Sequence, residues 1–123
     1  MDKIHENGKV TFTAGGAIAK GEFVKFDSGK VVPCTAKTDA AIGVALDAAA
    51  DGEILPVAVL GAFCGTAPVK ATAAIVQGAA ITCAGATVVA GDKVCGLALE
   101  AATASGDLIE CALCVPALNA VAA

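Results

Sequence analysis

The chain has 123 residues and a formal net charge of −4 at pH 7, enough length for one domain but few large side chains with which to build a core. It contains four Phe and no Trp, Tyr or Arg, which argues against a nucleic-acid binder, because such proteins typically use Arg for phosphate and guanine contacts. An enzyme pocket or a base-stacking platform also usually needs more large side chains than these.

The hydrophobic fraction, 57%, and the mean hydropathy, +0.78, are high for a soluble monomer. Neither candidate for a membrane span fits, because residues 71–91 include Thr, Gln and Gly, and residues 54–69 contain two Pro. The first eight residues are polar and do not resemble a secretory signal. We therefore expect no membrane association and extensive burial of apolar surface against partners.

The first half of the chain predicts a loose polar arm, residues 1–8, followed by short strands. Polar and apolar residues alternate over 9–13, and β-forming residues cluster over 22–26, 30–34 and 53–60. The segment Asp27-Ser28-Gly29 predicts a turn, and Pro33 places its strand at a sheet edge or a strand end. The Ala-rich segments near residues 40 and 50 are too short for stable helices, so they predict turns or single helical turns.

The second half repeats this plan. Three segments recur at offsets of 53 to 57 residues: Gly21–Phe26 with Gly78–Cys83, Gly29–Pro33 with Gly85–Val89, and Gly43 with Gly96. Residues 62–70 are expected to form a loop or an irregular strand, and Pro116 to end the last strand. The expected fold is all-β, with residues 9–123 forming one domain behind the arm. This domain is a compact β-barrel or sandwich built from two similar strand-turn-strand halves, about 18–60 and 75–115.

Six cysteines invite a metal or disulfide interpretation: Cys34, Cys64, Cys83, Cys95, Cys111 and Cys114. Only Cys111 and Cys114 have ligand-like spacing, and no second pair or His completes a tetrahedral set. On a strand, positions three apart face opposite sides of the sheet, so these two thiols would not share an ion. The cysteines are therefore expected to be reduced and buried as small hydrophobes, with no metal and no cofactor.

No catalytic set is recognisable, so the chain is not expected to be an enzyme. His5, the only histidine, lies in the arm, and Ser28 and Ser105 lie in predicted turns, so nothing holds a Ser-His-Asp relay together. Asp51 and Glu53 flank a turn glycine, where acids are common for solubility. A phosphate-binding loop of the P-loop type is absent from the sequence.

The Phe side chains are the largest apolar groups, and most are expected in the core. Phe23 and Phe26 are three apart on one predicted strand and so point to opposite faces. One of the two should therefore be exposed or covered by a partner subunit.

Five short segments occur in order along the chain: Thr11–Ala14, Lys20–Val24, Ile42–Asp47, Gly52-Glu53 and Val57–Gly61. Over Val10 to Val115 this arrangement resembles the small tailed-phage capsid cement, or decoration, proteins. Some members of that group are labelled recombinase-like, which this chain does not support because the phosphate-binding loop is missing. The chain departs from the pattern in its richness in Ala and Cys.

The resemblance implies a structural virion protein, made in the host cytoplasm, that binds the outer surface of an icosahedral phage capsid and stabilises it. The implied partners are the major capsid protein and copies of the chain itself, as a homotrimer or alternatively a dimer, without nucleic acid. The arm is expected to dock on a neighbouring capsid subunit, with Lys3 and Lys9 facing acidic groups. The expected capsid or subunit interface comprises Met1, Lys3, Ile4, His5, Lys9, Phe12, Phe23, Phe26 and Phe63. Three alternatives remain: a small ligand- or glycan-binding β-module, a shell protein that assembles by itself, and an enzyme whose site would be built from Asp47, Asp51 and Lys93.

Overall fold

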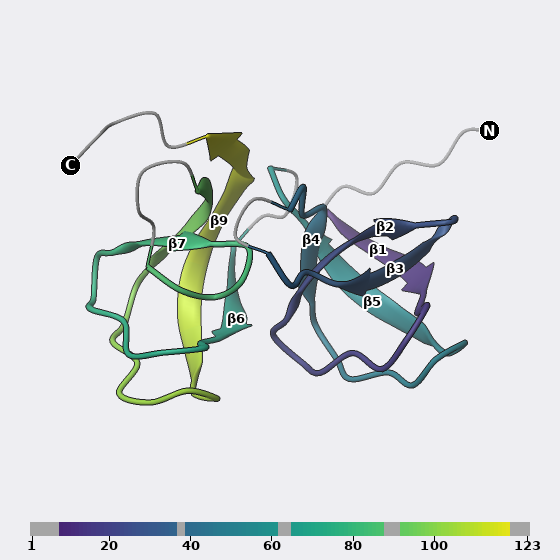
Figure 1. The fold of residues 1–123 in the computed structure, drawn as a ribbon, viewed down its shortest axis with the longest axis horizontal. Helices are drawn as coiled ribbons and strands as arrows, with labels where there is room; N and C mark the ends of the chain where they lie inside the picture. Colours follow the sequence, from purple (N-terminus) through teal and green to yellow (C-terminus); the bar gives the residue numbers. More distant parts are fainter. Residues whose placement is uncertain (1–7, 37–38, 62–64, 88–91, 119–123) are drawn as a thin grey trace.

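The structure is a computed structural model that describes residues 8–36, 39–61, 65–87 and 92–118. Within these residues the chain forms nine strands and no helix, and hence no helix long and apolar enough to cross a membrane. The strands form two antiparallel sheets that lie next to each other in Figure 1, the first in purple to teal and the second in teal to yellow. The all-β prediction is confirmed.

The first sheet has five strands and the second has four. The first comprises β1 (Lys9–Thr13), β2 (Phe23–Asp27), β3 (Lys30–Pro33), β4 (Gly43–Ala45) and β5 (Ile54–Val59), in the order β1-β5-β4-β2-β3. The second comprises β6 (Thr66–Lys70), β7 (Ala80–Thr82), β8 (Lys93–Ala98) and β9 (Leu108–Leu118), in the order β6-β9-β8-β7.

The hairpin of β2 and β3 forms where its turn residues predict it. Asp27 pairs with Lys30, so the loop consists of two residues, Ser28 and Gly29. Their φ angles are 52° and 80°, and positive φ at both positions is the geometry that matches the twist of a two-residue hairpin. Pro33, which has no N–H to donate to a further strand, lies on the edge strand β3 as predicted.

Two boundary predictions are wrong. Residues 66–70 form a regular strand, β6, because Pro68 lies on a sheet edge where its missing N–H breaks no ladder. The last strand does not end at Pro116 but continues to Leu118. The ladder between β8 and β9 shifts register there, with Cys95 alone lying opposite residues 114–116, so the proline falls within an irregular part of the strand pair.

The two sheets carry the same main-chain hydrogen bonds at corresponding positions. Matching donor and acceptor pairs are Gly21 to Ala45 and Gly78 to Ala98, Ile18 to Ala49 and Ile75 to Ala102, and Gly52 to Ala14 and Gly106 to Ala71. The ladders agree as well, since Lys9 lies opposite Ala58 and Thr66 lies opposite Ala112. We infer that the halves are copies of one unit, offset by 57 residues before the hairpin and by 53 or 54 after it.

The hydrophobic core follows the same correspondence. In the first sheet the core contains Ala14, Ile18, Val24, Ala45, Ala49, Leu55 and Val57. The second contains their counterparts Ala71, Ile75, Ile81, Ala98, Ala102, Ile109 and Cys111. The second cluster also includes Phe23, Ala41, Val44 and Leu60 of the first half. These four side chains therefore join the two sheets through shared apolar contacts. Burying each of the larger ones, Phe23, Val44 and Leu60, stabilises the fold by about 1 to 3 kcal/mol.

Candidate functional site

The junction between the two sheets is built from one face of the first sheet. Phe23 and Val44 lie opposite each other on β2 and β4 and are buried. They pack in one cluster with Val69 and Cys83 of the second half. Because alternate residues of a strand face opposite sides, this face is separate from the one that forms the first sheet's own core.

The backbone also crosses the junction. The N–H of Lys70 donates to the carbonyl oxygen of Gly21 at 2.9 Å. Gly21 has a φ of 87°, and a Cβ at this position would lie 2.6 Å from Cδ2 of Leu108 and 2.9 Å from the backbone nitrogen of Lys70. Only glycine permits both the backbone conformation and this approach of the two halves.

Ala36 and Asp39, which follow β3, contact Cys83 of the second half through their carbonyl oxygens. The backbone N–H groups of Thr35 and Ala36 donate to Oδ2 of Asp39 at 2.9 and 3.0 Å, and Nζ of Lys25 lies 3.1 Å from the same oxygen. The thiol of Cys83 donates to the backbone carbonyl oxygen of Asp39 at 2.9 Å. The hydrogen bond from Ala36, with those from Thr35 and Lys25, holds the pKa of the Asp39 carboxyl below its usual 3.8.

Replacing Asp39 by Ala is expected to lower the free energy of unfolding at pH 7 by about 1 kcal/mol, the usual effect of removing a side chain that caps backbone N–H groups. Since the pKa is lower in the folded than in the unfolded chain, this stabilisation is complete above about pH 4 and is lost as pH falls through the folded pKa. Urea unfolding should therefore show a larger difference at pH 7 than at pH 2.5. The exposed turn acid Asp51 provides the control, and an equal loss in Asp51→Ala would contradict the prediction.

The face of the second sheet that corresponds to the junction face is only partly covered by the described part of the chain. Ala80 lies opposite Leu97, as Phe23 lies opposite Val44, and Leu97 in turn lies opposite Ala112. Val44 is completely buried, whereas its counterpart Leu97 is 43% exposed. We call Ala80, Leu97 and Ala112 the Leu97 face.

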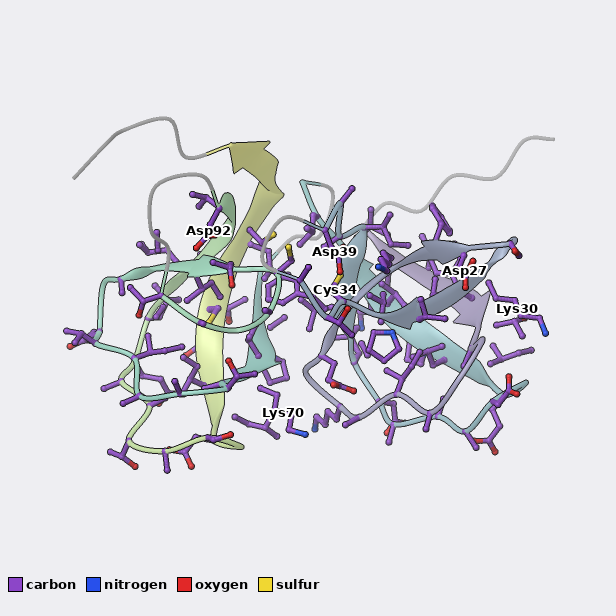
Figure 2. The ribbon with its side chains drawn as sticks, in the orientation of Figure 1. Asp27, Lys30, Cys34, Asp39, Lys70 and Asp92 are labelled. Atoms are coloured by element: carbon purple, nitrogen blue, oxygen red, sulfur yellow. The ribbon has the colours of Figure 1, made fainter. Side chains whose placement is uncertain are left out.

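The other side of the junction also has an uncovered counterpart. Cys83 and Leu108, which meet the first half, correspond by the same offsets to Phe26 and Ile54. Phe26 is 56% exposed and Ile54 is 72% exposed. The Phe26 ring packs edge-on against Phe12, with centroids 5.5 Å apart. We call Phe12 and Phe26 the Phe26 patch, whereas Ile54 lies on the face of β5 opposite to its buried neighbour Leu55. Figure 2 places Asp27, the neighbour of Phe26, on the side of the first sheet remote from the second.

Four of the nine residues predicted at an interface lie within the described part of the chain. Lys9 is exposed on β1, Phe12 is half-buried, Phe23 is buried at the junction and Phe26 is exposed. Phe23 and Phe26 thus take opposite faces of β2, as predicted. The remaining predicted residues, Met1, Lys3, Ile4, His5 and Phe63, lie outside the described residues.

Sequence reasoning missed Ile54 and Leu97 as candidate interface residues. Both lie in apolar runs that predict a buried strand, so nothing in the local pattern marks them. The one sequence feature that could have identified Leu97 is the repeat, because it aligns Leu97 with Val44. A single chain has only one other half with which to cover these two corresponding faces.

The acidic side chains in the turns accept hydrogen bonds from backbone N–H groups three residues before them. Examples are Ala19 to Glu22 at 2.7 Å, Ala50 to Glu53 at 2.7 Å, and Ala104 to Asp107 at 3.1 Å. Hydrogen bonds from Thr103 and Ala104 lower the pKa of Asp107. Glu53 therefore closes its turn in addition to favouring solubility, and these carboxylates serve as structural acceptors.

A cavity of about 170 Å³ lies at the junction, with Glu22, Cys34, Lys70, Thr72, Cys83 and Ser105 in its lining. Within the described ranges, no group of three or more His, Cys, Asp or Glu side chains is arranged to hold a metal ion. Cys111 is buried on β9, while the side chain of Cys114 lies outside the described part.

Comparison with known proteins decides the family. The model of the phage cement protein family matches residues 3–113. The chain belongs to this family. It is therefore a structural, capsid-associated phage protein, and the family places it in the virion. A search of curated proteins gives no match.

The fold of this chain is also similar to that of a solved structure. The crystal structure of the head fiber gp8.5 N base in bacteriophage phi29 aligns with a TM-score of 0.66 at 17% sequence identity, covering 85% of this chain and 92% of that one. At 17% identity this likeness shows a shared fold and nothing about a shared role.

Proposed function

We propose that the chain binds the outer surface of an icosahedral phage capsid as a homotrimer and stabilises the shell. Membership of the cement family supports the capsid role. The observation that carries the self-association is the pair of uncovered apolar surfaces, the Phe26 patch and the Leu97 face, which correspond to the two sides of the junction inside the chain.

The contact between copies follows from this correspondence. Within one chain, the Phe23 and Val44 face of the first half covers the second half near Cys83 and Leu108. The Leu97 face of one copy would cover the Phe26 patch of the next in the same manner. Such a contact joins two different surfaces, so it forms a ring where the rotation between copies closes and a filament where it does not, rather than a two-fold dimer. Three copies in the ring is the number that the resemblance to decoration proteins implies.

The arm is proposed to reach a neighbouring capsid subunit. Residue 8 is where this arm meets the fold, because Gly8 is buried and its carbonyl oxygen accepts a hydrogen bond from the N–H of Val59 at 2.9 Å. β1 begins at the next residue, Lys9, whose side chain is exposed. Lys3 and Lys9 would face acidic groups on the shell, and this attraction would weaken with added salt.

Removing residues 1–7 while keeping Gly8 is expected to abolish detectable binding to empty capsids. The affinity should fall at least about 100-fold, which corresponds to a loss of roughly 3 kcal/mol of binding free energy. The melting temperature should stay unchanged, because the ladder of β1 and β5 and the Gly8 hydrogen bond remain. Co-sedimentation with capsids built from the major capsid protein measures binding. Unaltered binding by the truncated chain would reject the docking role of the arm, and no binding by the full chain would reject the capsid role.

A further inference from the structure

Two cysteine side chains from different sheets meet at the junction. Cys34 follows β3 in the first sheet, and Cys83 follows β7 in the second. Both carry thiols. The Cys83 sulfur lies 3.8 Å from the carbonyl oxygen of Ala36 and 2.9 Å from that of Asp39, two residues that follow Cys34 closely in the chain. Cys34 also packs against the core cluster that contains Cys83. Figure 2 shows Cys34 close to Asp39, whose carbonyl oxygen accepts the Cys83 hydrogen bond.

A small reagent has a path to this pair. Both thiols line the junction cavity of about 170 Å³, and Cys34 is only half-buried. A water molecule occupies about 30 Å³ of liquid, so the cavity has room for hydrogen peroxide beside bound water. A tripeptide disulfide is too large for this space.

The two thiols differ in how readily they ionise. The hydrogen bond with Cys83 and burial both raise the pKa of Cys34. Cys83 is therefore the first of the pair to lose its proton, and its thiolate is the nucleophile.

We propose that Cys34 and Cys83 are a peroxide-sensitive pair whose oxidation links the two sheets by a disulfide. The Cys83 thiolate attacks one oxygen of hydrogen peroxide, expelling hydroxide and forming a sulfenic acid. The Cys34 sulfur then attacks the Cys83 sulfur, and the second hydroxide leaves with the Cys34 proton as water. One peroxide is reduced by two electrons and two thiols become one disulfide. This chemistry goes beyond the proposed capsid role and does not depend on it.

The test is to treat the reduced full-length protein with hydrogen peroxide and to digest it with trypsin without a reducing agent. Cleavage after Lys separates the cysteines, placing Cys34 in residues 31–37, Cys83 in 71–93 and Cys95 in 94–123. The expected product is one cross-linked peptide joining 31–37 to 71–93. The melting temperature should rise by about 10 °C, because the bond closes a loop of roughly 50 residues, and dithiothreitol should reverse it.

Single substitutions separate this pair from the other cysteines. Cys34→Ser should abolish both the cross-link and the rise in melting temperature, and Cys111→Ser should retain both. Cys83 also belongs to the same buried cluster as Cys95, so a peptide joining 71–93 to 94–123 in the native protein would overturn the proposal. A mass gain of two oxygens on Cys83 without any cross-link, or no reaction at all, would overturn it equally.

Discussion

Replacing Phe26 by Asp is expected to convert the assembled protein from about three times the chain mass of 11.8 kDa to the mass of a single chain. The side chain is 56% exposed in the chain, so the fold should tolerate the change. A carboxylate covered by the Leu97 face of the next copy would lack a partner, which costs several kcal/mol and weakens association at least about 100-fold. Analytical ultracentrifugation over a concentration series measures the mass.

Leu97→Asp should give the same monomer by altering the opposite side of the same contact. A mixture of the two variants offers a sharper result. The Phe26→Asp chain keeps an intact Leu97 face, and the Leu97→Asp chain keeps an intact Phe26 patch, so one good contact can form between them. We therefore expect a one-to-one dimer in the mixture that neither variant forms alone, since the remaining surfaces of the pair both carry an Asp.

The mixing experiment distinguishes this contact from a two-fold one. If each surface paired with its own copy, one variant would still dimerise by itself and mixing would add nothing. Val76→Asp is the control, because Val76 is 76% exposed and its counterpart, Ala19, belongs to neither core cluster. A trimer that survives both Phe26→Asp and Leu97→Asp would reject the proposed contact.

Replacing Gly96 by Ala is expected to lower the free energy of unfolding by about 3 kcal/mol and the melting temperature by about 10 °C. A Cβ at this position would lie 2.5 Å from the carbonyl oxygen of Ala112 on the neighbouring strand. That oxygen belongs to the backbone of β9, so it cannot move aside as a side chain would without disturbing the ladder. Thermal and urea unfolding measure the loss.

Gly43→Ala should destabilise the protein to a similar degree, because Gly43 is the counterpart of Gly96. Its added Cβ would meet the carbonyl oxygen of Ala58, the counterpart of Ala112, and Cγ1 of Val57 at 2.5 Å. Gly16→Ala is the matched control, since nothing lies within 4 Å of its added Cβ and the change should be within about 1 kcal/mol of neutral. Tolerance of alanine at both Gly43 and Gly96 would contradict the close packing of these strands.

The predicted elements agree with the structure where a local pattern was sufficient. The alternation over residues 9–13 predicts β1 with both ends correct, and Asp27-Ser28-Gly29 predicts the hairpin because Ser and Gly accept the positive φ angles that its turn needs. The errors at Pro68 and Pro116 both concern pairing with neighbouring strands, since Pro68 lies on an edge strand and Pro116 lies where the ladder of β8 and β9 shifts register. The effect of a missing N–H depends on whether another strand lies on that side, and this information is absent from the proline's neighbours in sequence.

For the candidate interface too, the local sequence pattern predicts only part of what the structure shows. Opposite faces for Phe23 and Phe26 follow from strand geometry alone, yet the strand pattern did not say which of the two would be buried. The cysteines behave similarly, because Cys34 and Cys83 are 49 positions apart in the chain and only the packing of one sheet against the other places both in the lining of one cavity.

Strand alternation, turn residues and recurring glycines are local properties, and they were sufficient to predict an all-β protein with a repeated plan and a resemblance to phage cement proteins. Which copy of each corresponding surface is covered depends on the packing of the two sheets. Val44 and Leu97 occupy corresponding positions in corresponding strands, but only Val44 has the other half of the chain packed upon it. Burial depends on neighbours remote in sequence, so two nearly equivalent segments can have different exposures and different functions.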